Sequence, residues 1–127
     1  MKFHVKLIAL AVSTLLVTSV NAQRRTVEER VSAVHEKFVS SFQLDAAKLA
    51  KVDSAFATYY RKQDKIREEA RQGGERPDFQ AMREKMQPAI EARDKELQGL
   101  LTAEQYKKWK EEIEPGMAPQ RPGRRDQ

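Results

Sequence analysis

The chain has no cysteine among its 127 residues, which excludes disulfide bonds and thiol redox chemistry. It also has only two histidines, one tryptophan, five glycines and five prolines. Because glycine and proline interrupt the chain so rarely, long stretches rich in Ala, Glu, Lys, Arg and Gln remain, and these residues favour helix. A fold without disulfides must be held together by packing, so we expect a helical protein with an apolar core.

The first 22 residues have the three parts of a secretory signal peptide. Residues 1–6 carry two lysines, residues 7–20 form an apolar run, and residues 20–22 supply the small side chains of a cleavage site. The apolar run is shorter than the roughly 20 residues that cross a bilayer. We therefore expect cleavage of residues 1–22, no stable membrane insertion, and export from the cytoplasm. The alternative is an uncleaved anchor.

The charge of the exported part is only mildly positive. Residues 23–127 keep 22 Lys and Arg against 19 Asp and Glu, a formal charge of +3. These cations are spread among carboxylates, whereas binding to a phosphate backbone requires a clustered basic face. We therefore expect no nucleic acid among the partners of this protein.

Apolar residues recur every three or four positions over most of the exported chain, which is the helical period. The pattern predicts helices over residues 26–41, 45–72, 78–100 and 102–113. The apolar stripes consist of Val27, Val31, Val34 and Phe38; Leu49, Val52, Phe56, Tyr59, Tyr60 and Ile66; Phe79, Met82, Met86, Ile90, Leu97 and Leu100; and Tyr106, Trp109 and Ile113. We expect Pro88 to bend the third helix near residues 84–88 without breaking it, because the stripe keeps its phase across it.

One helical domain over residues 23–114 accounts for this pattern, since 105 exported residues are enough for a single compact unit. Residues 115–127 combine three prolines, two glycines and three arginines with no apolar period. This composition predicts a disordered basic tail.

The segment Leu101-Thr102-Ala103-Glu104-Gln105 joins the third and fourth predicted helices. Thr102 can cap the new helix while Gln105 closes a reciprocal capping box, and Leu101 can pack on Tyr106 as a hydrophobic staple. The motif is therefore predicted to start a helix.

A second, partial copy of this motif precedes the second predicted helix. Asp45 is its cap and Leu44 can pack on Leu49, but Lys48 stands where the first copy has glutamine. With its signal peptide, its helical pattern and Leu-Thr-x-x-Gln before a Lys-rich aromatic helix, the chain resembles the Spy/CpxP (LTxxQ-motif) family of periplasmic proteins over roughly residues 26–113. The resemblance implies an ATP-independent chaperone or stress-signalling accessory in the periplasm of a Gram-negative-type bacterium. It also implies long bent helices, in a thin helical hairpin layer, that pair into a cradle-like homodimer.

Catalysis and metal binding find little support in the exported chain. It has no nucleophile with a base, no glycine-rich phosphate loop and no cofactor fingerprint, so we expect neither enzymatic activity nor a cofactor. The exported chain keeps a single histidine, His35, and has no cluster of metal-ligand residues in its sequence. We therefore interpret His35 as a surface or boundary residue of the first helix.

The methionines near the expected bend allow two interpretations. Flexible thioethers suit surfaces that accommodate many partners, but they are also ordinary core residues. Arg93 lies in phase with the apolar stripe, so it can snorkel, pair with a carboxylate such as Glu96, or face a client. The candidate client-binding residues are Met82, Arg83, Lys85, Met86 and Arg93.

These observations lead to one hypothesis of function and one alternative. The hypothesis is an extracytoplasmic, ATP-independent chaperone whose apolar and basic helical surface binds unfolded or misfolded proteins. The alternative is a regulatory interaction module that binds a membrane sensor in envelope stress signalling.

Overall fold

The computed structural model describes residues 25–74, 76 and 78–117. This part of the chain contains helices and no strand, so the predicted all-α fold is confirmed. The elements are α1 (Val27–Ser41), α2 (Ala46–Gln72), α3 (Phe79–Leu100), α4 (Ala103–Lys108), the π-helical turn η1 (Trp109–Ile113) and α5 (Glu114–Met117). The predicted signal peptide and residues 118–127 of the predicted tail lie outside the described residues.

Reciprocal capping boxes begin α1 and α4, and the second of them is the box predicted at Thr102. At α1 the Glu29 backbone N–H donates to the Thr26 hydroxyl at 3.2 Å, and the Thr26 backbone N–H donates to the Glu29 carboxylate at 2.9 Å. At α4 the same pair of bonds joins Thr102 and Gln105, at 3.2 and 3.0 Å. These bonds satisfy backbone donors that the first turn of a helix leaves without partners.

Single carboxylate caps begin the two long helices. Asp45 accepts the backbone N–H of Lys48 at 2.8 Å, and Asp78 accepts that of Gln80 at 2.9 Å. At its other end α2 stops at Gly73, and the following Gly74 adopts φ 66°, a left-handed conformation that glycine takes without steric cost. The chain can therefore reverse direction immediately after α2.

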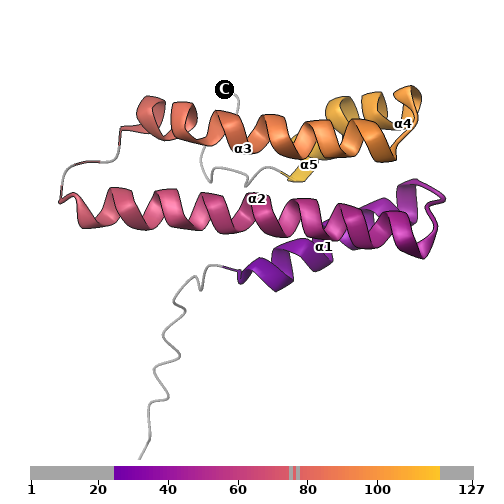
Figure 1. Ribbon diagram of the computed structural model, residues 1–127, viewed down its shortest axis with the longest axis horizontal. Coiled ribbons are helices and arrows are strands. Elements are labelled where there is room, and N and C mark those ends of the chain that lie inside the picture. The colour runs from indigo at the N-terminus through magenta and orange to yellow at the C-terminus, as the bar shows by residue number, and fades with distance from the viewer. Residues whose placement is uncertain (1–24, 75, 77, 118–127) are drawn as a thin grey trace, which may run out of the picture.

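The two longest helices, α2 and α3, lie side by side and form an antiparallel hairpin (Figure 1). At 27 and 22 residues, they are about 40 and about 33 Å long, given a rise of about 1.5 Å per residue. α1 packs along α2, and the chain returns through α4, η1 and α5 beside the same hairpin (Figure 1). None of the helices within the described ranges is long and apolar enough to span a membrane.

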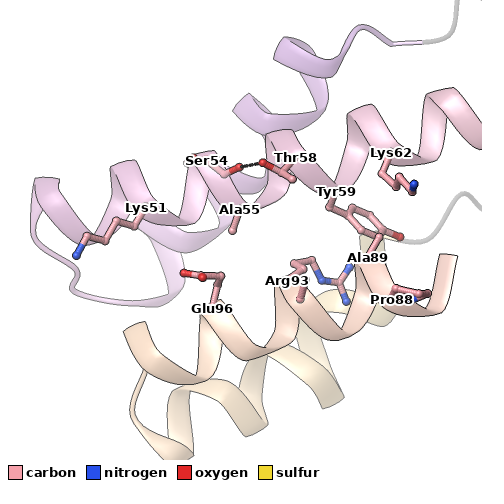
Figure 2. A pocket seen from close by; sticks show the side chains of 11 residues that line it. Lys51, Ser54, Ala55, Thr58, Tyr59, Lys62, Pro88, Ala89, Arg93 and Glu96 are labelled. Carbon is pink, nitrogen blue, oxygen red and sulfur yellow. Dashed lines mark hydrogen bonds between the residues drawn. The ribbon is translucent and has the colours of Figure 1, made fainter.

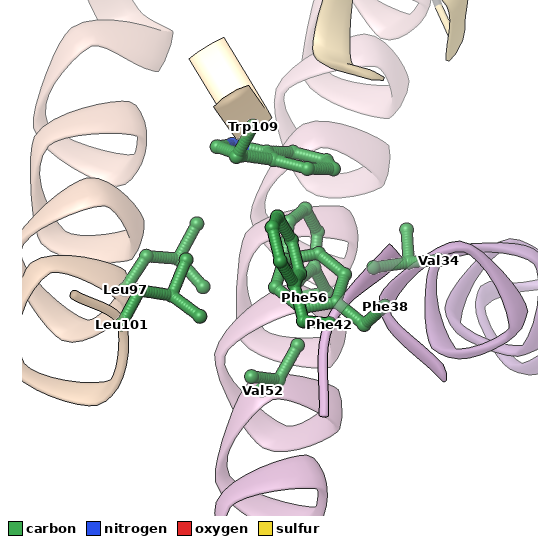
Figure 3. Packing of buried hydrophobic residues seen from close by; sticks show 8 residues of the cluster. All are labelled: Val34, Phe38, Phe42, Val52, Phe56, Leu97, Leu101 and Trp109. Atoms are coloured by element: carbon green, nitrogen blue, oxygen red, sulfur yellow. The ribbon is translucent and has the colours of Figure 1, made fainter. Parts of the chain in front are cut away.

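The core lies where all these segments meet, and aromatic rings dominate it (Figure 3). Its buried members are Val34, Phe38, Phe42, Val52, Phe56, Leu97, Leu101 and Trp109. The ring of Phe38 lies 5.9 Å from that of Phe56 and 5.0 Å from that of Trp109, measured between centroids. Such aromatic pairs add about 0.5–1.5 kcal/mol each beyond the burial of apolar area. The core thus joins α1 and η1 to the hairpin without any disulfide.

The predicted end of the fourth helix is wrong, because the chain stays helical to Met117 rather than stopping at Ile113. The prediction of a disordered tail is therefore also wrong at residues 115–117. Residues 109–113 form a π-helical turn, in which the Glu114 N–H donates to the Trp109 carbonyl five residues back. A proline ring normally clashes with the carbonyl four residues before it, and the wider π turn gives Pro115 the room that an α-helix lacks. Met117 then packs against the core, which stabilises the extra turn.

The third helix continues through Pro88 without a break, as predicted. Its predicted stripe is correct at Met86 and Leu97, which are buried, but wrong at Phe79, which is 77% exposed. Phe79 is the first residue of α3, directly after the connection from α2, so it lies at the end of the hairpin and away from the core.

Candidate functional site: a groove between α2 and α3

A groove of about 560 Å³ runs between facing stripes of α2 and α3 (Figure 2). Its lining consists of Lys51, Ser54, Ala55, Thr58, Tyr59 and Lys62 from α2, and Pro88, Ala89, Ala92, Arg93 and Glu96 from α3. The α2 members recur at helical spacing, so they share one face of that helix. The groove uses none of the eight buried core residues, and most of its lining side chains are exposed to solvent.

Small side chains create the groove. Ala55 from α2 and Ala89 and Ala92 from α3 line it, and Pro88 lies beside Ala89 (Figure 2). Packed helices stand roughly 8–10 Å apart, and alanine methyl groups are too short to fill the surface of that space. The floor of the groove is therefore apolar, shallow and accessible.

Cations mark both ends of the groove. Lys51 and Lys62 lie 11 positions apart on α2, which is about 16 Å along the helix axis. Neither lysine forms an ion pair with another described residue. Both ammonium groups are therefore available to an acidic partner.

Arg93 lies in the wall of the groove and is only 7% exposed. Its guanidinium donates to Asp94 at 2.8 and 3.0 Å and to Glu114 at 3.3 Å. Its central carbon also lies 4.5 Å from the centroid of the Tyr59 ring and 5.5 Å from that of Phe56, within cation–π range. Its carboxylate partners are thus Asp94 and Glu114, not the suggested Glu96.

Lys110 completes a network of four charged groups that includes this arginine. Its ammonium donates to Asp94 at 3.1 Å and to Glu114 at 3.0 Å. Burial alone would lower the pKa of Lys110, but the hydrogen bonds and negative charges of Glu114 and Asp94 outweigh burial and raise that pKa above its ordinary value. The network ties α3 to the C-terminal helices and holds Arg93 beside the groove.

Only Arg93 among the five candidate client-binding residues lines the groove. Met86 is buried, at 9% exposure, which corresponds to the core interpretation of this methionine. Met82 is half-buried, whereas Arg83 and Lys85 are exposed. The structure therefore separates these four residues from the groove.

The residues of the motif that begins at Leu101, and of its second copy at Leu44, start helices and contact the core rather than forming a binding site. Thr102, Gln105 and Asp45 form the capping bonds given above. Leu101 is buried in the core, and Leu44 is partly buried against it. The motif thus positions α2 and α4, and through them the groove and its Arg93 network.

Sequence reasoning did not identify the alanines of the floor or the two lysines at the ends. A signal was present, because Ala89 and Ala92 are one turn apart on α3 and Ser54 and Ala55 follow Lys51 on α2. Small residues on one face of each of two long helices indicate a place where the helices leave open space between them.

His35 is a boundary residue, as predicted. It is half-buried, and its Nδ1 lies 2.9 Å from the carboxylate of Asp53, which joins α1 to α2. No group of three or more His, Cys, Asp or Glu side chains within residues 25–74 and 78–117 is arranged to hold a metal ion.

The fold and site together define a small all-helical protein with an open groove on a helical hairpin. Residues 18–109 match the family described as "Domain of unknown function (DUF4890)", so the chain belongs to this family. The match extends through α1, α2, α3 and α4 to the first residue of η1. No curated protein and no solved structure matches the chain.

Proposed function

We propose that the protein is an exported, ATP-independent chaperone that binds unfolded segments of other proteins in the groove between α2 and α3. The observation that carries this proposal is the accessible apolar floor between two cationic ends. Apolar side chains of a client would lie against Ala55, Ala89 and Ala92, while Lys51 and Lys62 attract acidic residues on either side.

The small size of the groove is consistent with transient binding. Stable protein complexes bury roughly 1,200–2,000 Å², and a groove that spans about 16 Å offers a client much less. Weak, reversible contact suits a protein that must release its clients without hydrolysing nucleotide. The proposed mode of action is therefore passive protection of exposed apolar segments from one another.

The resemblance to the Spy/CpxP family supports both export and chaperone activity, and it extends the proposal to a homodimer. Pairing two copies would lengthen the apolar and basic surface available to one client. Light scattering at micromolar concentration tests this part, and a mass of one chain at all concentrations would contradict it.

An aggregation assay tests the proposed activity. The exported form, residues 23–127, should slow the aggregation of a chemically unfolded client without nucleotide when added in several-fold excess. No effect at that ratio would refute chaperone activity. A pulldown dominated by one membrane sensor domain would instead favour the regulatory alternative.

A matched pair of variants tests the groove. Ala92 lies in the groove and Ala50 lies outside it, and both are exposed alanines within long helices. Ala92→Gln fills the groove with a longer neutral side chain and should reduce protection several-fold, whereas Ala50→Gln should leave it unchanged. Equal protection by both variants would mean that clients bind elsewhere.

A further inference from the structure

A second cavity, of about 990 Å³, lies between the first half of α1, α2 and the η1–α5 segment. We call it the aromatic cavity, because Phe56, Tyr60 and Trp109 contribute to its lining together with Met117. The side chains of Tyr59 and Arg93 line both this cavity and the groove between α2 and α3. The two cavities are therefore neighbours with different walls, and the volume of the second is at the upper end for small-molecule sites.

The charged side chains that line the aromatic cavity include arginines that are not paired with a carboxylate of the described chain. The carboxylates of the lining are each paired with a cation: Asp64 with Arg30 at 2.6 Å, Glu114 with Lys110 at 3.0 Å and Arg93 at 3.3 Å, and Glu68 with Arg71 at 3.7 Å. Two arginines of the lining, Arg25 and Arg67, form no ion pair with any described residue. A ligand that complements this cavity in charge is an anion.

Trp109 offers this cavity its ring rather than its hydrogen-bond donor. The residue is 1% exposed, and its indole Nε1–H is buried without an acceptor in the described chain. Because this nitrogen is closed to solvent, a ligand in the cavity would contact the indole ring and not the N–H.

We propose that the aromatic cavity binds a small organic anion with an apolar body, of the class of aromatic carboxylates and sulfonates. The apolar body packs on Tyr60, Met117 and the ring of Trp109, and the acidic group binds Arg67 and Arg25. This site lies beside the groove and does not depend on the proposed chaperone activity.

A pair of probes that differ in charge tests the proposal. 1-Anilinonaphthalene-8-sulfonate has the required anion and ring system, and N-phenyl-1-naphthylamine has the same rings without the sulfonate. Trp109 is the only tryptophan of the chain, so its emission reports binding beside it. The exported protein should bind one sulfonate probe with quenching of Trp109, and the neutral probe should bind about tenfold more weakly. Equal affinity for the two probes, or binding that leaves Trp109 emission unchanged, would overturn the proposal.

Two cations of α2 provide the matched variants. Arg67 lines only the aromatic cavity, whereas Lys62 lines only the groove. Arg67→Gln should weaken sulfonate binding about fivefold or more, and Lys62→Gln should change it less than twofold. Circular dichroism confirms that both variants stay folded. Equal weakening by the two substitutions would show that the probe binds in the groove, and the proposed site would be wrong.

Discussion

Arg93 and Lys110 share the same two carboxylates, so we expect their contributions to stability to depend on each other. Arg93 is buried against Tyr59 and donates to Asp94 and Glu114. Lys110, in η1, donates to the same two carboxylates. When one of the two cations is removed, the remaining cation still pairs with Asp94 and Glu114. Removing both leaves two partly buried carboxylates without any cation.

The expected losses follow from burial and from the remaining partners. Arg93→Met removes charge-assisted hydrogen bonds and a cation–π contact, but Lys110 still compensates both carboxylates, so the loss is about 2 kcal/mol. Lys110 is 32% exposed, and solvent screening limits the loss in Lys110→Met to about 1 kcal/mol. The double variant should lose at least about 1 kcal/mol more than the sum of the two, because uncompensated buried charge is strongly unfavourable.

Urea unfolding at neutral pH measures these differences. Helical circular dichroism and the emission of Trp109, which is buried in the core, provide two independent signals. Arg71→Met, in an exposed ion pair with Glu68, is the control and should cost less than about 0.5 kcal/mol. If the loss of stability in the double variant equals the sum of the two single losses within about 0.5 kcal/mol, the carboxylates do not need a shared cation and the reasoning is wrong.

Three further predictions use the same unfolding assay. Thr102→Ala should cost about 1 kcal/mol because it removes the capping box of α4, whereas Ser32→Ala, at an exposed helix position, should cost almost nothing. Leu97→Ala should cost about 3 kcal/mol because the side chain is fully buried, and Val39→Ala, at 54% exposure, should cost less than about 0.5 kcal/mol. Burial raises the pKa of Tyr60, so the folded protein keeps a proton that the unfolded chain releases near pH 10. Stability should therefore fall as the pH rises above that value, and Tyr60→Phe should make the fall smaller; an equal fall in both proteins would contradict this.

The helix boundaries could be predicted well wherever a local cap defines them. Thr26, Asp45, Asp78 and Thr102 all begin helices as expected, because a capping side chain binds backbone N–H groups only two or three residues away. The end at Met117 could not be predicted in this way. There a contact between Met117 and the distant core outweighs the local tendency of Pro115 to end a helix.

The candidate site was harder to predict than the fold. The two methionines were selected for their chemistry, but their accessibility depends on what packs over them, and Met86 proved to be buried. Arg93 was singled out because a charge in phase with an apolar stripe requires a partner, and the structure pairs it with carboxylates. Its partner Glu114, however, lies 21 residues away, and no sequence spacing indicates that contact.

Periodicity, caps and the distribution of glycine and proline were enough to establish that this chain is all-helical and where most of its helices begin. These features act within a few residues of one another, so their energies depend little on the rest of the fold. The groove, the shared carboxylates and the aromatic cavity arise from which helix faces meet. Side chains such as Ala55 and Ala92, or Trp109 and Arg67, acquire a common surface only after α2, α3 and the C-terminal helices have packed around the core.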